Sequence, residues 1–330
     1  TISDRGPSVD CMNDQQATGS KVCPQGKRGR VFLLPGYAPS IYAIELGDTS
    51  ARFAEMVTLK GASGKPLTGL TNPPVGRRDE SSFAADGRHL EADPAGIEPG
   101  GLVRLADGTF FIAEGYGPSI VEAGPDGAVR RRIVPEGLAD GFRPADYPVL
   151  ATLPARLADR SPGRGFGAIA LTRDERHLLV ALQSPPATAG ETPVVDVTAI
   201  ERASGGVVGA YRYPLDLPAP AAAGARLIDS RLVEMLVADD DCLLVLERQS
   251  DVARIYRVTI ASPVAGAPAT QPIRNKTLLF STEQSAMGMG RLTGMAMLSP
   301  TELIVTSSEL GMDGARTQLF RLTFSRPLTN

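Results

Sequence analysis

Short apolar runs recur along the chain, separated by turns rich in Gly, Asp and Pro. The clearest pair is residues 101–105 and 109–113, which flank the turn Ala106-Asp107-Gly108. Apolar runs of this length around such a turn are typical of a β-hairpin. Three further pairs have the same plan: 168–171 with 177–182, 232–237 with 242–246, and 294–298 with 302–306. The pattern therefore predicts an all-β protein.

A six-residue motif is repeated within the first part of the chain. The letters GYAPSI at residues 36–41 are matched by GYGPSI at residues 115–120, a spacing of 79 residues. This spacing equals two units of about 40 residues, the length of a propeller blade. Helical periodicity is almost absent, and 35 Gly and 27 Pro interrupt the chain at short intervals. We predict a single β-propeller with six blades.

The propeller is expected to follow an irregular arm. We assign residues 1–29 to this N-terminal arm and residues 30–330 to the propeller domain. The first blade is predicted to begin with residues 31–34 and 41–46, and residues 53–59 are expected to complete it. No shift in composition divides the rest of the chain.

A long polar segment, residues 61–96, interrupts the series of predicted strands. Connections of this length are uncommon inside a compact domain, and they often carry function. We interpret the segment as a lid or rim loop over a pocket. Its one histidine, His89, is a candidate acid or base at the rim.

Composition excludes several classes of function. The net charge is −3, Trp is absent, and aromatic residues make up 5% of the chain, which argues against a nucleic-acid-binding surface. No apolar run approaches the ~20 residues needed to cross a bilayer, so no membrane span is predicted. The G-x-S-x-G elbow, the P-loop and a complete G-x-G-x-x-G motif are all missing. A small-molecule ligand remains the most suitable partner.

The cysteines indicate an exported protein. Cys11 and Cys23 lie in the polar arm, which has no apolar run of its own, and a disulfide would supply the missing constraint. Cys242 lies in an apolar run and is expected to be a buried free thiol. The chain starts at Thr1, which suggests a removed leader, although artificial trimming would give the same start. We predict a disulfide-bearing periplasmic or secreted protein.

Acidic residues stand at the ends of several predicted strands. Glu98 precedes one strand of the 101–113 hairpin and Glu114 follows the other, so antiparallel pairing brings both to one edge of the sheet together with Tyr116. Glu247 and Glu309 also follow apolar strands. These carboxylates either share a cation or form salt bridges with arginines at comparable positions. The arginines concerned are Arg164, Arg231, Arg248 and Arg291.

The residues around this hairpin resemble a known family. The run from GKPLTGL at residues 64–70 to GYGPSI at residues 115–120, followed by GPDGAVRRRIVPEGL at residues 124–138, closely resembles the phytase-like "esterase-like activity" β-propeller family of exported bacterial proteins. Later pieces agree in order, among them RGF at residues 164–166 and LVLER at residues 244–248. The resemblance covers about residues 30–325, and it implies a propeller that hydrolyses an ester or phosphoester.

The chain departs from this family at acidic positions. In the family, several blades open with Glu-Gly, whereas the corresponding pairs here are Gly100-Gly101, Gly167-Ala168 and Thr293-Gly294. A hard cation such as calcium needs several oxygen ligands, so it is expected to bind weakly or not at all unless Glu98, Glu114 or Glu309 substitute. The missing side chains are also expected to open space at the mouth of the channel.

The leading prediction is an exported hydrolase with its site at the mouth of the propeller channel. The candidate catalytic residues are Glu98, Glu114, Tyr116, Arg164 and Glu309. The candidate substrate-binding residues are Tyr37, His89, Gln183, Glu247, Arg248 and Arg291. One alternative is a propeller with a dismantled metal site that binds a small molecule or catalyses a metal-free rearrangement. The second is a calcium-dependent lactonase.

Overall fold

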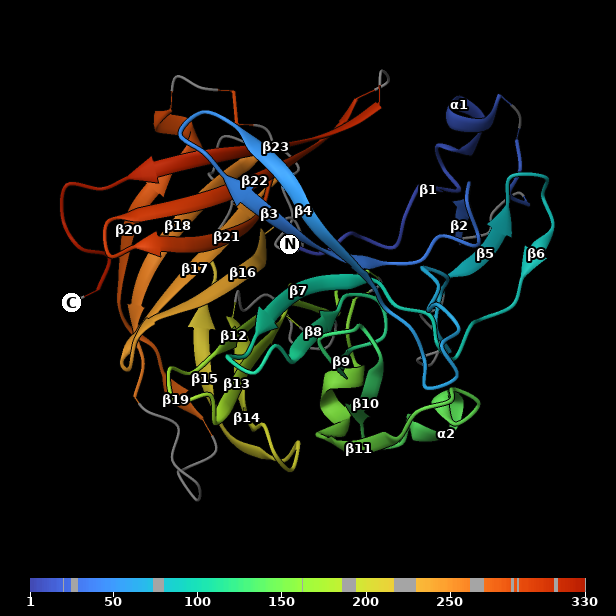
Figure 1. Ribbon diagram of the computed structural model, residues 1–330, viewed down its shortest axis with the longest axis horizontal. Coiled ribbons are helices and arrows are strands. Elements are labelled where there is room, and N and C mark those ends of the chain that lie inside the picture. The colour runs from blue at the N-terminus through green and yellow to red at the C-terminus, as the bar shows by residue number, and fades with distance from the viewer. Residues whose placement is uncertain are drawn as a thin grey trace. The chain divides into compact units, whose positions relative to one another are not determined.

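The computed structural model consists almost entirely of β-strands with short helical turns (Figure 1). It describes residues 1–19, 21–24, 29–73, 80–161, 163–185, 194–216, 230–261, 270–285, 288–289, 291–311 and 314–329. The chain divides into two compact units, Thr1–Phe166 and Gly167–Asn330. Within the described ranges, none of the helices has the length and apolar character of a membrane span.

The first unit contains a five-stranded sheet in the order β11-β10-β9-β8-β7. Its strands are β7 (Pro99–Arg104), β8 (Phe110–Glu114), β9 (Ser119–Ala123), β10 (Val129–Pro135) and β11 (Val149–Leu153). The hairpin predicted around Ala106-Asp107-Gly108 is confirmed as β7 and β8, and Figure 1 shows the strands of this sheet in green. Every residue of β8 is buried, which explains the apolar run at residues 110–113, and the strand ends with the buried Glu114. Two helical turns, α2 (Ala139–Phe142) and η1 (Ala155–Ala158), flank β11.

A four-stranded sheet joins the N-terminal arm to the predicted rim loop. Its order is β1-β2-β5-β6, and its strands are β1 (Ser8–Asp10), β2 (Gly29–Phe32), β5 (Ser81–Ala84) and β6 (His89–Leu90). Strand β2 pairs with β1 on one side and, in parallel, with β5 on the other.

The predicted first blade is therefore wrong, because both edges of β2 are already hydrogen-bonded to segments distant in sequence. Strands β3 (Ser40–Leu46) and β4 (Ala51–Thr58) instead form a separate hairpin. The predicted rim loop also contains two strands, β5 and β6. The boundary between an arm ending at residue 29 and a propeller domain stays a prediction.

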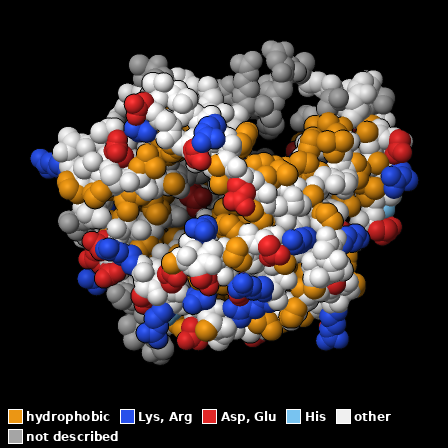
Figure 2. Space-filling model, viewed as in Figure 1, with side chains coloured by type: hydrophobic (Ala, Val, Ile, Leu, Met, Phe, Trp, Pro, Cys, Tyr) orange, Lys and Arg blue, Asp and Glu red, His pale blue; other side chains and the backbone are white. Residues whose placement is uncertain are grey.

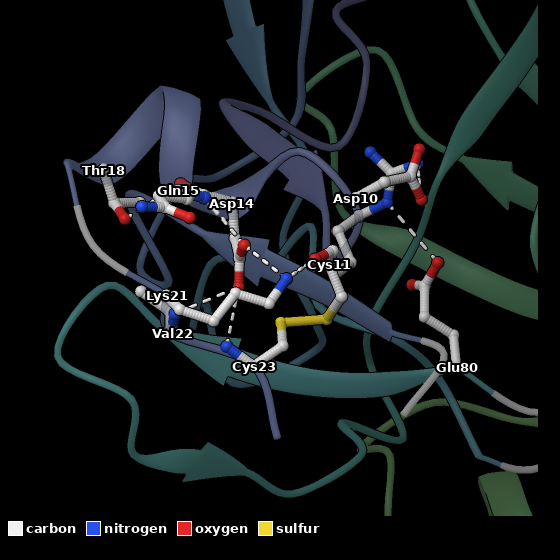
Figure 3. The surroundings of a disulfide bond; sticks show 10 residues. Asp10, Cys11, Asp14, Gln15, Thr18, Lys21, Val22, Cys23 and Glu80 are labelled. Atoms are coloured by element: carbon white, nitrogen blue, oxygen red, sulfur yellow. Dashed lines mark hydrogen bonds and ion pairs between the residues drawn. A yellow bond between two sulfur atoms is a disulfide. The ribbon is translucent and has the colours of Figure 1, made fainter. Parts of the chain in front are cut away.

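The arm is closed by the predicted disulfide between Cys11 and Cys23, whose Cα atoms lie 5.5 Å apart (Figure 3). The two half-cystines pack with Val31 and Phe83 in a small buried cluster, so the arm does take part in a core. A loop of 12 residues closed in this way stabilises the folded state by about 3 kcal/mol in the chain-entropy model. Cys242 is free and buried, as predicted.

A buried carboxylate organises the loop inside this disulfide. Asp14 begins the short helix α1 (Asp14–Thr18), and its side chain is fully buried. One oxygen accepts hydrogen bonds from Lys21 Nζ and Gln15 N, both at 2.7 Å, and the other accepts from Val22 N at 3.0 Å and Cys23 N at 2.7 Å (Figure 3). Burial alone would raise the pKa of Asp14, but these hydrogen bonds outweigh it and lower the pKa to about 2.

Asp14→Asn is expected to lower the melting temperature at pH 7. A carboxyl whose pKa falls on folding stabilises the protein above its unfolded pKa of about 3.9, and this stabilisation is lost as the pH falls through about 2. Thermal unfolding followed by circular dichroism should therefore show a difference between the wild type and Asp14→Asn that shrinks between about pH 4 and 2. Asp48→Asn, at an exposed position, is the matched control. A difference that stays constant with pH would contradict the assignment.

The second unit contains three sheets built mainly from antiparallel pairs, shown in yellow-green to red in Figure 1, and only the short β19 is paired in parallel among the described pairs. The first has the order β12-β13-β14-β15-β19, with β12 (Phe166–Leu171), β13 (His177–Leu182), β14 (Val194–Glu201), β15 (Val207–Pro214) and β19 (Gln271–Pro272). The second is β16 (Ser230–Asp239), β17 (Cys242–Gln249), β18 (Val252–Thr259) and β20 (Arg274–Ser281), which the turn η3 (Thr282–Gln284) follows. The third is β21 (Leu292–Ser299), β22 (Glu302–Gly311) and β23 (Gly314–Thr323). All three hairpins predicted in this part of the chain are confirmed.

Central strands of these sheets are buried on both faces. Cys242, Leu244 and Leu246 pack in one apolar cluster, and Leu243 and Val245 on the opposite face of β17 pack in another. On the face of the molecule shown in Figure 2, acidic and basic side chains are mixed with apolar ones. The all-β class is thus established, while closure into six blades stays a prediction.

Candidate functional site

The β7–β8 hairpin brings Glu98, Glu114 and Tyr116 together, as its predicted register requires. Pro99 lies opposite Glu114 in the antiparallel pair. Gly115 N donates to Glu98 O at 2.7 Å, and Glu98 N donates to Glu114 Oε1 at 3.1 Å. Tyr116 N donates to the same carboxylate oxygen at 3.0 Å. The grouping is therefore present, while the catalytic roles of its members stay predictions.

Glu114 is an internal acceptor of hydrogen bonds. Its side chain is fully buried, and its second oxygen accepts from Asn72 Nδ2 at 2.8 Å. Burial raises the pKa of Glu114, although the positive charge of Arg132 and the donated hydrogen bonds oppose this shift. Because this carboxylate is inaccessible to a substrate, its contribution is to position the backbone at Glu98 and Tyr116.

Asn72 explains one glycine of the repeated motif. A Cβ atom at Gly117 would lie 2.5 Å from Asn72 Oδ1, so a side chain there would displace the amide that holds Glu114. No local pattern in the sequence indicates this role of Asn72, because its carboxylate partner lies 42 residues away.

Glu98 is the partly accessible carboxyl of the group. Its side chain is 22% exposed, and Oε2 lies 3.3 Å from Nη1 of Arg5, an N-terminal arginine that is itself buried. The same Nη1 is 2.9 Å from Glu80 Oε1, and Arg30 Nε is 3.4 Å from Glu80 Oε2. Two carboxylates and two guanidinium groups therefore lie in contact.

Burial has the largest effect on the titration of Glu98. It raises the pKa to about 7, although Arg5 acts in the opposite direction; the charges of Asp4 and Glu80 add to the rise. A carboxyl with this pKa exchanges protons near neutral pH, as a general acid or base must.

Tyr116 is held inside the protein by arginines and backbone. Its hydroxyl accepts a hydrogen bond from Glu80 N at 2.9 Å. The guanidinium groups of Arg5 and Arg160 lie 5.6 and 4.7 Å from the centre of its ring, close enough for cation–π attraction. The side chain is 1% exposed. Tyr116 therefore supports the position of Glu80 and is too deeply buried to meet a substrate.

The loop after η1 places Arg164 beside the same hairpin. Gly165 N donates to Gly115 O at 2.7 Å, and a Cβ atom at Gly165 would lie 2.7 Å from that oxygen. Arg164 N donates to Ser161 O at 3.0 Å, and its side chain is buried. Arg164 thus belongs to the surroundings of the hairpin.

The two other candidates of this unit are Tyr37 and His89. Tyr37 is half-buried, and its ring occupies the space next to Gly6, where a Cβ atom would come within 2.5 Å. His89 is 55% exposed in β6, contacts the edge of Phe83, and lies 3.4 Å from Glu91 Oε1. No described contact joins either residue to Glu98 or Glu114, so their substrate-binding roles stay predictions.

In the second unit, Glu247 is paired with a lysine. Lys276 Nζ lies 2.5 Å from Glu247 Oε1 and 2.7 Å from Asp216 Oδ1, between the rings of Tyr213 and Tyr256. The Tyr213 hydroxyl donates to Glu247 at 2.5 Å. Burial raises the pKa of Glu247, and Lys276 opposes the shift. In the described contacts, Glu247 is paired with Lys276 and Glu98 with Arg5. Neither of these partners is among the four arginines named from the sequence.

Arg248 lies beside two other arginines. Arg231 is its cross-strand partner, Arg248 Nη1 donates to Leu292 O at 3.2 Å, and the adjacent Arg291 lies 3.4 Å from Asp251. Burial, followed by the charges of Arg231 and Arg291, lowers the pKa of Arg248 to about 10. Glu309 lies opposite Arg316 in β22 and β23, but its side chain is outside the described residues.

Comparison with protein families identifies this chain. A family model described as phytase-like, "esterase-like activity of phytase", matches residues 35–307. The chain belongs to this phytase-like family. The matched part includes the whole β7–β8 hairpin with Glu98, Glu114 and Tyr116. It excludes Arg5, so the arginine that contacts Glu98 comes from outside the family match.

Three solved structures illustrate what this phytase-like chain is similar to. A protein of unknown function from Bacteroides caccae is 13% identical, with 72% of this chain and 64% of that chain covered and a TM-score of 0.36. The WD40 repeats of RRP9 are 9% identical, with coverages of 70% and 62% and a TM-score of 0.36. Virginiamycin B lyase from Staphylococcus aureus is 14% identical, with coverages of 87% and 85% and a TM-score of 0.35.

The chain spans less than two thirds of the first two of these structures. No curated protein sequence matches it. The family membership therefore rests on the match to residues 35–307.

The acidic residues of this phytase-like chain do not fit a divalent cation as they stand. Calcium takes six to eight oxygen ligands. Both oxygens of Glu114 already accept N–H groups, and Oε2 of Glu98 faces the guanidinium of Arg5. Among the described residues, no three His, Cys, Asp or Glu side chains form a group suited to a metal ion. We therefore derive no catalytic step through calcium.

The expectation that glycine in place of the family's glutamate opens space is wrong at Gly167. The absence of a side chain at Gly167 was expected to open space, but a Cβ atom there would lie 2.3 Å from Gln183 Cγ and 3.1 Å from Leu232 O. The side chain of Gln183 fills this position. Gln183 O also accepts from Leu232 N at 2.8 Å, so the residue links β13 to β16.

Proposed function

We propose that the protein is an exported β-propeller hydrolase that cleaves an ester or phosphoester, with Glu98 as its acid–base residue. The observation that carries the proposal is the place of Glu98 in the network: its carboxyl is partly exposed, whereas Glu114 and Tyr116 beside it are buried. The pKa of about 7 suits proton transfer at neutral pH. The phytase-like family supports the choice of ester and phosphoester substrates.

The network supplies the parts that hydrolysis requires. Glu98 as a carboxylate takes a proton from a water molecule while the water oxygen attacks the carbonyl carbon or phosphorus. The bond to the leaving oxygen then breaks, and Glu98 returns the proton to that oxygen. Arg30, 24% exposed, and the buried Arg5 place positive charge near the negative charge that develops on the substrate. Glu114 fixes the backbone on which Glu98 is held.

The Cys11–Cys23 disulfide supports export, because such bonds persist in the periplasm or outside the cell. The succession of small sheets, most of whose strand pairs are antiparallel, supports a propeller, for which six blades are the proposed number.

Hydrolysis of chromogenic substrates tests this function. 4-Nitrophenyl acetate, butyrate and phosphate would be assayed with the wild type, with Glu98→Gln and with Glu91→Gln, an exposed glutamate in the same unit. We expect turnover of at least one substrate by the wild type and by Glu91→Gln, and a loss with Glu98→Gln. Equal rates for all three proteins would show that Glu98 is not the acid–base residue.

A second candidate function is metal-free ligand binding or rearrangement at the same residues. The contact of Glu98 with Arg5 favours it, since an arginine supplies positive charge without a metal. Mass spectrometry of the product distinguishes the two functions: hydrolysis adds one water to the substrate, whereas rearrangement leaves its mass unchanged.

A further inference from the structure

Three arginines of the second unit lie close together where β16 begins and β17 ends. Arg231 in β16 and Arg248 in β17 are directly opposite each other in the antiparallel pair, so both side chains stand on the same face of the sheet. Arg248 Nη1 donates to Leu292 O at 3.2 Å, which brings the preceding residue, Arg291, to the same place. Arg231 and Arg248 are half-buried and Arg291 is exposed, so a ligand from solvent can reach the cluster.

The positive charge of this cluster is only partly balanced. Arg291 Nε lies 3.4 Å from Asp251 Oδ1, and Asp251 is the one described carboxylate whose charge acts on Arg248. Three guanidinium groups and one carboxylate leave a net charge of +2 among these described residues. Asp251 is also 86% exposed, so water screens its charge. A negatively charged ligand would therefore relieve the repulsion between the arginines.

The titration of Arg248 agrees with this repulsion. Burial has the largest effect on its pKa, and the charges of Arg231 and Arg291 act in the same direction, so the pKa falls to about 10. The charge of Asp251 opposes the shift without cancelling it.

Arg248 also has one edge of its guanidinium available for a ligand. Its Nη1 is engaged by Leu292 O, whereas the opposite edge, formed by Nε and Nη2, meets no acceptor among the described residues. Two parallel N–H groups on one edge match two oxygens of the same phosphate, sulfate or carboxylate group. The free edge therefore suits an oxyanion.

We propose that Arg231, Arg248 and Arg291 bind an oxyanion with two negative charges, namely a phosphate or sulfate group. Arg248 contacts two of its oxygens through Nε and Nη2, and the other two arginines supply the remaining positive charge. Two negative charges balance the cluster, whereas a monocarboxylate would balance only half of it. The site lies in the second unit, goes beyond the proposed hydrolase and does not depend on the role of Glu98.

Isothermal titration of the full chain tests the site. Sodium sulfate, sodium phosphate and phenyl phosphate are titrated separately at pH 8, where phosphate esters carry two negative charges, and the ionic strength is kept constant with NaCl. The wild type is expected to bind one equivalent of these anions, more weakly as NaCl is raised, and to bind sodium acetate less tightly than any of them. If none of the three binds saturably, or if acetate binds equally well, the proposal is wrong.

The same titrations distinguish two sources of the anion. Tighter binding of phenyl phosphate than of both inorganic ions would assign the site to a phosphate ester. Equal or weaker binding of phenyl phosphate would assign it to the free ion, and both results support an oxyanion site.

Arg248→Gln is expected to weaken the binding of sulfate by roughly tenfold to a hundredfold, the contribution of hydrogen bonds to a charged group. Arg326→Gln removes an exposed arginine elsewhere in the second unit and is the matched control, with the affinity of the wild type. An equal loss of affinity in both variants would mean that the anion responds only to the overall charge of the protein.

Asp251→Asn separates binding from damage to the fold, because it is expected to change the affinity in the opposite direction. The substitution raises the net charge of the cluster and should tighten sulfate binding by about two- to fivefold, whereas a damaged site would only bind more weakly. Arg291→Gln, also at an exposed position, should weaken it. These two variants decide the question even if Arg248→Gln does not fold, and an unchanged affinity in both would overturn the proposal.

Discussion

Glu98→Gln is expected to lower kcat/KM for an ester or phosphoester by about 10²–10⁴-fold, the usual contribution of general acid–base catalysis. Glutamine has nearly the same shape, but it cannot accept and return a proton. The carboxylate form of Glu98 takes the proton from water, so wild-type kcat/KM should rise with pH and level off above about pH 7. The measurement is kcat/KM between pH 5 and 9.

Two results would count against this role. One is a pH dependence near 7 that persists in Glu98→Gln, because another group would then be responsible for it. The other is an equal loss in Glu91→Gln, whose glutamate is 93% exposed. If kcat/KM falls only in Glu98→Gln, and if the kcat/KM of this variant no longer changes with pH near 7, Glu98 is the residue that titrates.

Glu114→Ala is expected to destabilise the protein by about 3 kcal/mol or more. The substitution removes the acceptor for Asn72 Nδ2, Glu98 N and Tyr116 N, and each buried donor left without a partner costs about 1–3 kcal/mol. Equilibrium unfolding in urea measures the loss. Activity should fall as well, since the backbone that carries Glu98 is released.

Glu55→Ala is the control for this loss. Glu55 is exposed in β4, and surface substitutions usually change the free energy of unfolding by less than about 0.5 kcal/mol. A similar small change in Glu114→Ala would mean that water or neighbouring groups replace the carboxylate, and the positioning role would then be abandoned.

Local patterns were sufficient to predict most of the hairpins. The turn Ala106-Asp107-Gly108 and the apolar run at the start of β17 have physical causes within a few residues, namely the positive φ of Gly108 and burial of the strand on both faces. The arm sheet has no such local cause. Strand β2 pairs in parallel with β5, which lies about fifty residues later in the chain. No hydrophobic pattern in either segment indicates that the two strands will pair.

For the candidate site too, the sequence predicts the contacts within one hairpin and does not predict the contacts between distant segments. Glu98, Glu114 and Tyr116 were grouped correctly because the register of one hairpin determines their proximity. Their partners were missed, since Arg5 is separated from Glu98 by 93 residues. Lys276 was missed for the same reason, being 29 residues from Glu247 on another strand. An isolated Arg or Lys in a sequence does not indicate which carboxylate it will meet.

The contact of Arg5 with two acids also constrains how related sequences can change. Loss of the arginine alone would leave Glu80 and Glu98 facing each other, so we expect the three positions to vary together among homologues. Relatives without this arginine should lack one of the acids. An alignment of the family, compared column by column at these three positions, would show this covariation, and independent variation would show that natural sequences tolerate the unpaired acids.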